Sequence, residues 1–587
     1  MNARGVLLRW FVAGGLGTLL MACVGVDGRD VISGKQQSPS VTVVAKADVH
    51  PSDELIAERI RTRIENAGIV TDLLAAGERV YEGLVLPKFY ERRLYHPAWS
   101  DGRGPTRLAD DLMNALRQAD LDGLRSVDYH LATIAAVLAA ARVDANKDSV
   151  AAPDRWAELD LLLTDAFLVY GAHLLAGRVN PVTLRPEWMA NPRTNDIAAV
   201  LEGVLASGNI AGALEELVPT QFGYRRLREA LGRYRAVAAT GGWPSLPDGL
   251  MLQKGDSSHA VVLLRSRLRL KDDLGSAEEP GNELFDEGLE LAVKNFQRRH
   301  GLTADGIVGG ATRAELEVRV ERRVDQLELN LERWRWLPKD LGRHHIIVNI
   351  AAFELEVVEE RRVMLAMRVV VGRLYHRTPV LSDTMRYLVL NPYWHVPRSI
   401  AVEEILPKVS RDRAYLARTK LRLFPISGPD GQEVDTTTVD WSAITPEHFP
   451  LRLRQDPGPL NALGRVKFMF LNKYNVYLHD TPSRSLFGES QRDFSHGCIR
   501  IQQPIELAAY LLRQDQRWNR DTLLRSLKEA VDRTVPLPEP IPVHLLYWTA
   551  WADEDGTIQF RKDIHDRDTP LLTALRAPPT VGPEAYH

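Results

Sequence analysis

Two short segments toward the C-terminal end of the chain contain side chains whose types and spacing suit nucleophilic chemistry. The first, residues 475–482, reads NVYLHDTP, and the second, residues 495–501, reads SHGCIRI. Alternate residues of a strand share one face, so His479 lies on one face of the first segment, and Cys498 and Arg500 share one face of the second. If the segments are neighbouring strands, they bring an imidazole, a thiol and a guanidinium together with the tyrosine phenol of the first segment.

That set of side chains suits acyl transfer by a cysteine. A thiol is mostly protonated at neutral pH, and a nearby imidazole or cation lowers its pKa so that the thiolate can attack a carbonyl. We expect Cys498 to be the nucleophile and His479 to be the base that takes its proton and later protonates the leaving amine. Gly497 allows close backbone approach, so the amides of Gly497 and Cys498 are candidate oxyanion donors. Arg500 can hold a substrate carboxylate through a two-point fork.

Other readings of the same residues remain open at this point. A lone cysteine is usually a small core residue, and the neighbouring Ile499 and Ile501 fit that reading, although a flanking glycine and arginine do not. The ligand types also allow a metal site built from His479, His496 and Cys498, but no fourth ligand stands at zinc-like spacing. We therefore expect neither a metal nor another cofactor.

Composition limits the classes of protein to consider. The chain has 587 residues, 45% of them apolar, with 74 Lys and Arg against 77 Asp and Glu, which gives a net charge of −3. At roughly 100–200 residues per domain, this length predicts three to five domains. The absence of a basic excess argues against a nucleic-acid binder. Two cysteines, Cys23 and Cys498, exclude a disulfide-stapled scaffold and a cysteine-rich zinc module.

The N-terminus reads as an export signal. Residues 1–22 carry two arginines and no acids, and their apolar run is short for a membrane-spanning helix. They end in LMAC at residues 20–23, which resembles the lipobox of bacterial lipoproteins, in which the cysteine is acylated and becomes the mature N-terminus. By this resemblance Cys23 is a lipid anchor, and Val24 favours the outer membrane over the inner one. A plain secretory peptide and an uncleaved anchor are the alternatives.

Changes in residue pattern divide the chain into regions. Apolar residues recur at three- and four-residue steps before the breaker-rich GGWPSLP at 241–247, and β-branched runs begin near residue 343. We expect a multidomain α+β protein. Its regions are a signal peptide 1–22, a tether 23–52, a helical scaffold domain 53–245, a compact domain 249–318, a mostly-β domain 343–535 with an inserted cap 401–459, and a strand-containing C-terminal extension 536–587.

The compact domain closes with a recognisable signature. Residues 296–312 match the pattern FQ…GL…DG.VG..T at nearly every position, and the segment resembles the type 1 peptidoglycan-binding domain. That resemblance implies a small three-helix fold that binds the bacterial cell wall. By itself it would identify a binding module and not an enzyme.

The two chemical segments carry a second resemblance. HDTP at 479–482, followed sixteen positions later by SHGCIR at 495–500, is similar to the active-site motif of YkuD-type L,D-transpeptidases. With the wall-binding and helical regions, the chain resembles the large periplasmic murein L,D-transpeptidases of Gram-negative bacteria. The family often has Asn where this chain has Arg500. The resemblance implies catalytic roles for Cys498 as nucleophile, His479 as base, Ser495 as the residue that orients His479, and Gly497, and substrate-binding roles for Tyr477, His496, Arg500 and Trp394.

The reaction follows from this resemblance. Cys498 attacks the third-residue carbonyl of a tetrapeptide stem and expels D-alanine, and a diaminopimelate amine on a neighbouring stem resolves the thioester as a 3→3 cross-link. Water or a D-amino acid as acceptor would give L,D-carboxypeptidase or exchange activity. The family is acylated by carbapenems at this cysteine, and the cap is expected to limit water at the site. A non-catalytic tether, joining membrane and wall through Cys23 and residues 249–318, is the alternative from a different class.

The resemblances also predict the location and the partners of the protein. We expect a periplasmic lipoprotein whose partners are peptidoglycan stem peptides and glycan, a membrane through the Cys23 anchor, and other wall-synthesis enzymes. No nucleic-acid partner is expected.

Overall fold

The computed structural model describes most of the chain beyond residue 50. The predicted signal peptide, Cys23 and the tether up to residue 50 lie outside the described residues. The described ranges are 51–67, 73–101, 103–145, 152–184, 188–189, 193–247, 249, 251–269, 281–427 and 431–579.

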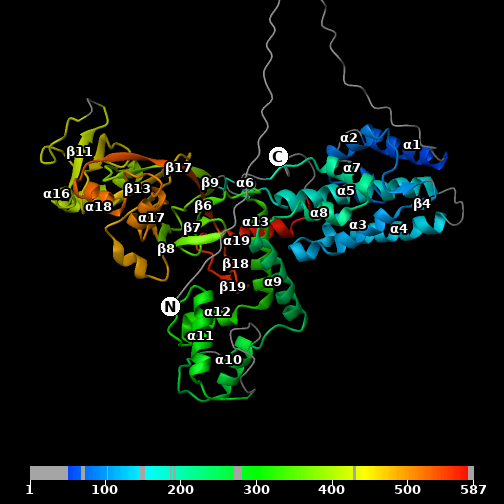
Figure 1. The fold of residues 1–587 in the computed structure, drawn as a ribbon, viewed down its shortest axis with the longest axis horizontal. Coiled ribbons are helices and arrows are strands. Elements are labelled where there is room, and N and C mark those ends of the chain that lie inside the picture. Colours follow the sequence, from blue (N-terminus) through cyan, green and yellow to red (C-terminus); the bar gives the residue numbers. More distant parts are fainter. Residues whose placement is uncertain are drawn as a thin grey trace, which may run out of the picture. The chain divides into compact units, whose positions relative to one another are not determined.

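The N-terminal region is helical and packs around one long helix, α5, which spans Ala152–Ala176 (Figure 1). Among the described residues, α5 is the one helix long and apolar enough to cross a membrane, yet 94% of its most apolar window is buried within the protein. It therefore serves here as a core helix. The other elements are α1 Pro51–Asn66, β1 Leu74–Ala75, β2 Glu78–Arg79, α2 Val85–Arg92, β3 Ser100–Asp101, β4 Gly104–Pro105, α3 Arg107–Arg117, η2 Ala119–Asp122, η3 Ser126–Tyr129, α4 Leu131–Ala145, α6 Pro181–Leu184, β5 Trp188–Met189, α7 Ile197–Ser207, α8 Ile210–Glu215 and α9 Phe222–Ala239.

The compact domain contains three helices, α10 His259–Arg269, α11 Glu287–Arg299 and α12 Gly310–Glu317. Its signature residues form the closing loop, because the buried Gln297 side chain donates to the Asp305 carboxylate at 2.7 Å and accepts from the Gly306 amide at 2.8 Å. The FQ…DG spacing thus fixes a turn in which the Gln297 side chain supplies hydrogen-bond partners that the backbone alone does not provide. The predicted three-helix fold is confirmed.

The mostly-β region is built on one large sheet. Its strands are β6 His344–Asn349, β7 Glu354–Glu359, β8 Arg362–Gly372, β9 Val380–Leu390, β13 Val466–Phe470, β14 Leu478–His479, β15 Asp493–Ser495, β16 Ile499–Ile501 and β17 Arg533–Leu546. With β5 of the N-terminal region, neighbours follow the order β13-β14-β16-β8-β7-β6-β17-β9-β5, and β13 also pairs with β9, so the sheet closes on itself. Helices α17 Pro504–Leu511 and α18 Arg520–Lys528 contribute side chains to its core. The predicted multidomain α+β class is confirmed.

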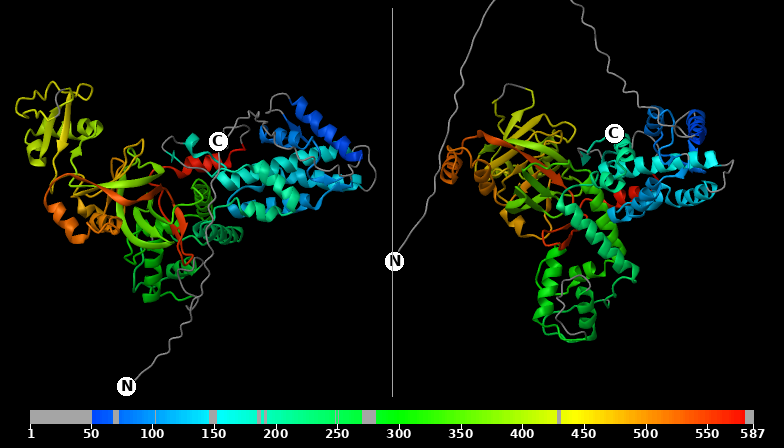
Figure 2. Two further views of the ribbon diagram at one scale, coloured as in Figure 1. Left: turned by 45° about the horizontal axis from the view of Figure 1, so that its top comes forward. Right: turned by 45° about the vertical axis from the view of Figure 1, so that its right-hand side comes forward.

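The cap has a sheet and a core of its own. Its strands β10 Trp394–His395, β12 Leu451–Gln455 and β11 Leu421–Pro425 pair in that order. Its helices are α14 Arg398–Ile400, η4 Ala401–Ile405, α15 Leu406–Arg411 and α16 Tyr415–Thr419. Figure 2 draws the cap (yellow) as a compact unit beside the catalytic strands. Because β10 belongs to this sheet, the cap begins at Trp394 and not at the predicted residue 401.

Strand β17 crosses the predicted boundary at residues 535–536. It pairs antiparallel with β9 and parallel with β6, so residues 536–546 belong to the closed sheet and not to a separate extension. The prolines in this stretch hide the alternating pattern, and the structure accommodates them with a register shift between Pro536 and Ile541.

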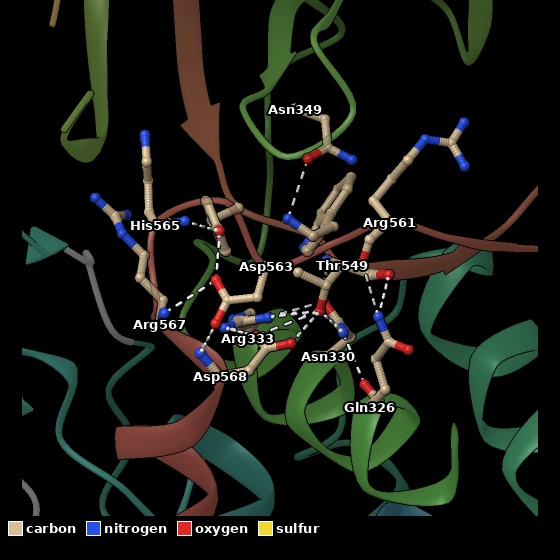
Figure 3. A network of polar contacts seen from close by, with 12 residues as sticks. Gln326, Asn330, Arg333, Asn349, Thr549, Arg561, Asp563, His565, Arg567 and Asp568 are labelled. Atoms are coloured by element: carbon tan, nitrogen blue, oxygen red, sulfur yellow. Dashed lines mark hydrogen bonds and ion pairs between the residues drawn. The ribbon is translucent and has the colours of Figure 1, made fainter. Parts of the chain in front are cut away.

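Helix α13, Val320–Arg335, joins the regions through a buried polar network with the C-terminal segment (Figure 3). Arg333 donates to the Asp568 carboxylate at 2.6 Å and to the Thr549 hydroxyl at 3.1 Å. Gln326 donates to the Thr549 carbonyl at 2.8 Å, and Asn330 accepts from the Thr549 amide at 3.0 Å. The remaining elements of this segment are β18 Ala550–Ala552, β19 Ile558–Phe560 and α19 Asp568–Arg576.

Arg333→Met tests how much this network contributes to the stability of the folded protein. The substitution leaves the Asp568 carboxylate without its cation, and breaking a buried pair in this way costs about 3–5 kcal/mol. We expect a clear fall in the midpoint of denaturant unfolding followed by circular dichroism. Arg517→Met, which breaks the surface pair with Asp515, is the control and should leave the midpoint unchanged. Equal midpoints for the two variants would contradict the assignment.

Candidate active site

The two chemical segments lie side by side in the sheet. Strands β14 and β16 pair in parallel, with Leu478 beside Ile499 and His479 beside Arg500. Leu478 and Ile499 are fully buried in the sheet core. Because neighbours in register share a face, the residues one position away, Tyr477 and Cys498 among them, project to the opposite face of the sheet.

The Cys498 thiol sits in a partly exposed but densely packed position. Burial raises the pKa of the thiol, and hydrogen bonds from Tyr477 and the charges of Lys467 and Arg500 oppose that rise without cancelling it. The thiol itself points its hydrogen at the Asn475 carbonyl, with a sulfur–oxygen distance of 3.8 Å. The resting side chain at neutral pH is therefore the protonated thiol.

Lys467 is a site residue that no sequence motif marks. It faces His479 across the β13–β14 pair, and its ammonium lies 3.9 Å from the centroid of the Tyr477 ring. Burial lowers the pKa of Lys467, while the charge of the Cys498 thiolate raises it. A cation held this close favours the thiolate when the proton leaves.

His479 is almost fully buried and lies on the same face of the paired strands as Cys498. Its Nδ1 donates to the Asp480 carbonyl at 2.6 Å, which places the ring hydrogen on Nδ1 and leaves Nε2 with a lone pair. Burial, followed by the charge of Arg500, lowers the pKa of His479 to about 3. The imidazole is therefore neutral at physiological pH and fit to accept a proton. No hydrogen bond joins it to Cys498 among the described residues, as is common for catalytic pairs without substrate.

Ser495 closes the turn that carries Cys498. Its hydroxyl donates to the Cys498 carbonyl at 2.5 Å and accepts from the Gly497 amide at 3.1 Å. We expected Ser495 to orient His479, but the Asp480 carbonyl makes that contact instead. Because the Gly497 amide is engaged, the Cys498 amide, which donates to no described group, is the better oxyanion donor.

The turn is also braced from outside. The Thr378 hydroxyl donates to the Gly497 carbonyl at 2.9 Å and accepts from the Gly372 amide at 2.9 Å. A Cβ atom on Gly372 would lie 2.0 Å from the His376 carbonyl oxygen, so only glycine fits there. From the C-terminal segment, Arg567 donates to the Thr378 carbonyl at 2.9 Å. Close backbone packing thus sets the position of Gly497, whose φ of +107° itself favours glycine.

Arg500 has a charge that no carboxylate among the described residues compensates within ion-pair distance. Burial lowers the pKa of its guanidinium, and its Nε is buried without a hydrogen-bond partner. Since it lies beside His479 on the thiol face, it can receive a substrate carboxylate. The described residues contain no group of His, Cys, Asp and Glu that could hold a metal ion.

His496 faces the cap. Its Nε2 lies 3.0 Å from the carboxylate of Glu404, and Arg373 donates to the same carboxylate at 2.7 Å. His496 and Arg373 thereby connect the nucleophile turn and the end of β8 to the π-helix of the cap. The structure places Trp394 in the cap sheet, where it pairs with Gln455, and gives it no described contact with the thiol. Arg373 and Glu404 carry no sequence motif that marks them.

Comparison with known proteins matches three parts of the chain to family models. These are "Scaffold domain" over residues 85–231, "Putative peptidoglycan binding domain" over 258–316 and "L,D-transpeptidase catalytic domain" of the YkuD family over 343–527. The predicted family of the catalytic domain and the predicted wall-binding module are confirmed.

Two curated proteins are similar to parts of the chain. A Haemophilus influenzae protein named "Putative L,D-transpeptidase" is 35% identical over 252 residues, which cover 42% of this chain and 49% of that protein. The Mycobacterium tuberculosis protein "N-acetylmuramoyl-L-alanine amidase CwlM" is 41% identical over 76 residues, covering 12% of this chain and 19% of its own. The chain thus spans at most about half the length of the curated relatives it matches.

Solved structures give weaker similarities. An L,D-transpeptidase from Xylanimonas cellulosilytica is 17% identical with a TM-score of 0.17, and the match covers 51% of this chain and 98% of that one. An L,D-transpeptidase from Stackebrandtia nassauensis is 13% identical with a TM-score of 0.20, and the match covers 52% and 96% of the two chains.

The protonation state of the resting site can be tested by alkylation. Because the thiol pKa is raised, we expect the rate of Cys498 modification by iodoacetamide to climb with pH to beyond pH 9. Lys467→Met removes a stabilising cation, so the climb should move to higher pH, whereas Lys473→Met on the exposed loop should not move it. Mass spectrometry of the Cys498 peptide follows the rate. A rate that is constant between pH 5 and 8 would instead reveal a preformed thiolate–imidazolium pair.

Proposed function

We propose that this chain, which combines an L,D-transpeptidase catalytic domain of the YkuD family with a peptidoglycan-binding domain, forms 3→3 cross-links in peptidoglycan through a cysteine acyl-enzyme. The observation that carries the proposal is the parallel pairing of β14 with β16. It supports the proposal because Tyr477, His479, Cys498 and Arg500 share one face of the paired strands. A non-catalytic wall tether would have no use for this arrangement.

The acylation step uses these groups in order. His479 Nε2 takes the thiol proton as the Cys498 sulfur bonds to the third-residue carbonyl carbon of a tetrapeptide stem. The Cys498 amide donates to the oxygen that becomes negative, while Lys467 stabilises the sulfur charge during the transfer. The C–N bond to the terminal D-alanine then breaks, and the leaving nitrogen receives the proton from His479. A thioester on Cys498 and free D-alanine result.

The second step reverses the roles of the same groups. The side-chain amine of diaminopimelate on a neighbouring stem attacks the thioester carbon and gives a proton to His479. The C–S bond breaks, the sulfur regains its proton, and an amide joins the two stems. Arg500 is placed to hold a stem carboxylate during either step. Water or a D-amino acid in place of the amine gives the carboxypeptidase or exchange reaction at the same site.

In this proposal the cap determines which acceptor, water or an amine, resolves the thioester. Glu404 bonds to both Arg373 and His496, so the cap is fastened directly to the nucleophile turn. A fastened cap excludes water and favours the amine of a bound stem. Cell-wall chemistry places the protein outside the cytoplasm, and we propose a periplasmic lipoprotein anchored through Cys23.

Covalent trapping tests the nucleophile. Incubation of the full chain with a disaccharide-tetrapeptide should give a mass increase equal to the fragment minus D-alanine, located on Cys498, with D-alanine released. Cys498→Ala should give no adduct. His479→Gln, which keeps a polar side chain of similar size but removes the base, should slow acylation by about 10²–10⁴-fold. The absence of an adduct on the wild type, or its survival in Cys498→Ala, would refute the proposal.

The role of the cap is tested by Glu404→Gln. Loss of the charged contacts to Arg373 and His496 should loosen the cap, so the ratio of tripeptide product to cross-linked dimer should rise about three- to tenfold, by chromatography of the products. Glu403→Gln is the matched control, because Glu403 is exposed and lies 3.8 Å from His376. An unchanged product ratio in Glu404→Gln would show that the cap does not control which acceptor reacts.

A further inference from the structure

A second cleft lies away from the thiol, where the peptidoglycan-binding domain meets the catalytic domain. Its volume is about 640 Å³. The end of α11 and the following loop, residues 298–304, line one side. The other side is lined by the start of β7, by Arg368 of β8, by the loop 488–492 and by Arg561, Lys562 and Ile564 of the C-terminal segment.

The walls of this cleft are held together by direct contacts. Arg561 donates to the Arg299 carbonyl at 3.0 Å, and Arg299 donates to the Ile558 carbonyl at 3.4 Å. The His300 ring stacks on Phe560 with a centroid distance of 5.5 Å. The cleft is therefore part of the folded structure and is shaped before a ligand arrives.

The cleft carries an excess of positive charge. Three carboxylates also line it: Glu315, which bonds to Arg323, and Glu354 and Glu489. Neither Lys562 nor any of the lining arginines lies within ion-pair distance of a carboxylate among the described residues. The lining cations are Arg298, Arg368, Arg492, Arg561 and Lys562.

Two of these cations are partly or wholly buried with neutral partners alone. Arg492 is 7% exposed and donates to the carbonyls of Val369, Glu489 and Phe353. Burial, and then the charge of Arg368, lowers the pKa of Arg492 to about 10. Arg561 likewise bonds to carbonyl and amide oxygens, and burial lowers its pKa. The charge of Glu354 acts on both arginines without forming an ion pair with either. A buried guanidinium that has no paired carboxylate is stabilised when an anion enters, and its fork matches a carboxylate.

The remaining lining suits a peptide and not a lone ion. Thr303, Ser490 and Gln491 offer hydroxyl and amide groups that can bond to a backbone, and the volume is that of a pocket for a ligand of many atoms. We propose that this cleft binds the carboxylate-bearing peptide stem of peptidoglycan at a site separate from the nucleophile. The identity of the ligand rests on the proposed function.

The cleft connects to the nucleophile through a short piece of chain. The loop 488–492 continues into β15, Asp493–Ser495, and Arg492 precedes Cys498 by six residues. Six residues span at most about 22 Å even when fully extended. A stem held in the cleft therefore fixes its glycan strand within reach of the thiol, where another stem of the same wall can react.

Binding measurements on Cys498→Ala, which cannot turn over, test the site without catalysis. The probe is a fluorescent disaccharide-tetrapeptide, followed by anisotropy on the full chain. We expect Arg368→Gln and Lys562→Gln each to weaken binding about three- to tenfold, with a larger loss when both are combined. Arg362→Gln, on the same strand as Arg368 but outside the cleft, should bind as the parent does. A probe with amidated carboxylates should bind weakly and equally to all five proteins.

Each other outcome overturns the proposal. These outcomes are no binding by the parent, equal binding by the cleft variants, or equal competition by an unrelated polyglutamate peptide. Both test residues are exposed, and unchanged thermal midpoints show that the variants are folded. The acylation of wild-type Cys498 is a separate measurement. If acylation fails, the transpeptidase reaction is rejected, and the binding experiment still tests the cleft independently.

Discussion

The site depends on one strand pairing, the parallel contact of β14 with β16. A strand has a side-chain period of two, so a slip by one residue would turn Cys498 into the core and bring Ile499 to the surface. The register is fixed because Leu478 and Ile499 fill the closed sheet. The same apolar pair that stabilises the sheet therefore decides which face receives the thiol, and the catalytic geometry is a consequence of core packing.

Burial at this pairing sets the chemistry as well as the geometry. It raises the pKa of Cys498 and lowers that of His479, so both side chains rest uncharged at neutral pH. A neutral thiol is less nucleophilic and less easily oxidised than a thiolate. The positive charges of Lys467 and Arg500 stabilise the thiolate of Cys498 when the thiol loses its proton. The site is thus arranged for charge that appears during the reaction and not before it.

Parts of the chain far from the motif hold it in place. Thr378 contacts Gly497, and Arg567 and His565 of the C-terminal segment reach back to Thr378 and Gly372, the latter with a nitrogen–oxygen distance of 2.7 Å. The C-terminal segment is in turn held by α13 through the buried network of Figure 3. Helix α13 therefore also supports the backbone around Cys498.

The sequence alone predicted the chemistry of the site, because the motifs HDTP and SHGCIR and the FQ…DG loop are local patterns that can be identified without knowledge of long-range contacts. It also predicted the α+β class from residue patterns, and the three-helix module from its resemblance to the type 1 peptidoglycan-binding domain. Tertiary structure alone decided that Lys467 faces His479, that Glu404 reaches His496, and that β17 runs past the boundary expected at residue 536. These features depend on strand register and sheet closure, which are fixed by contacts between residues far apart in the chain.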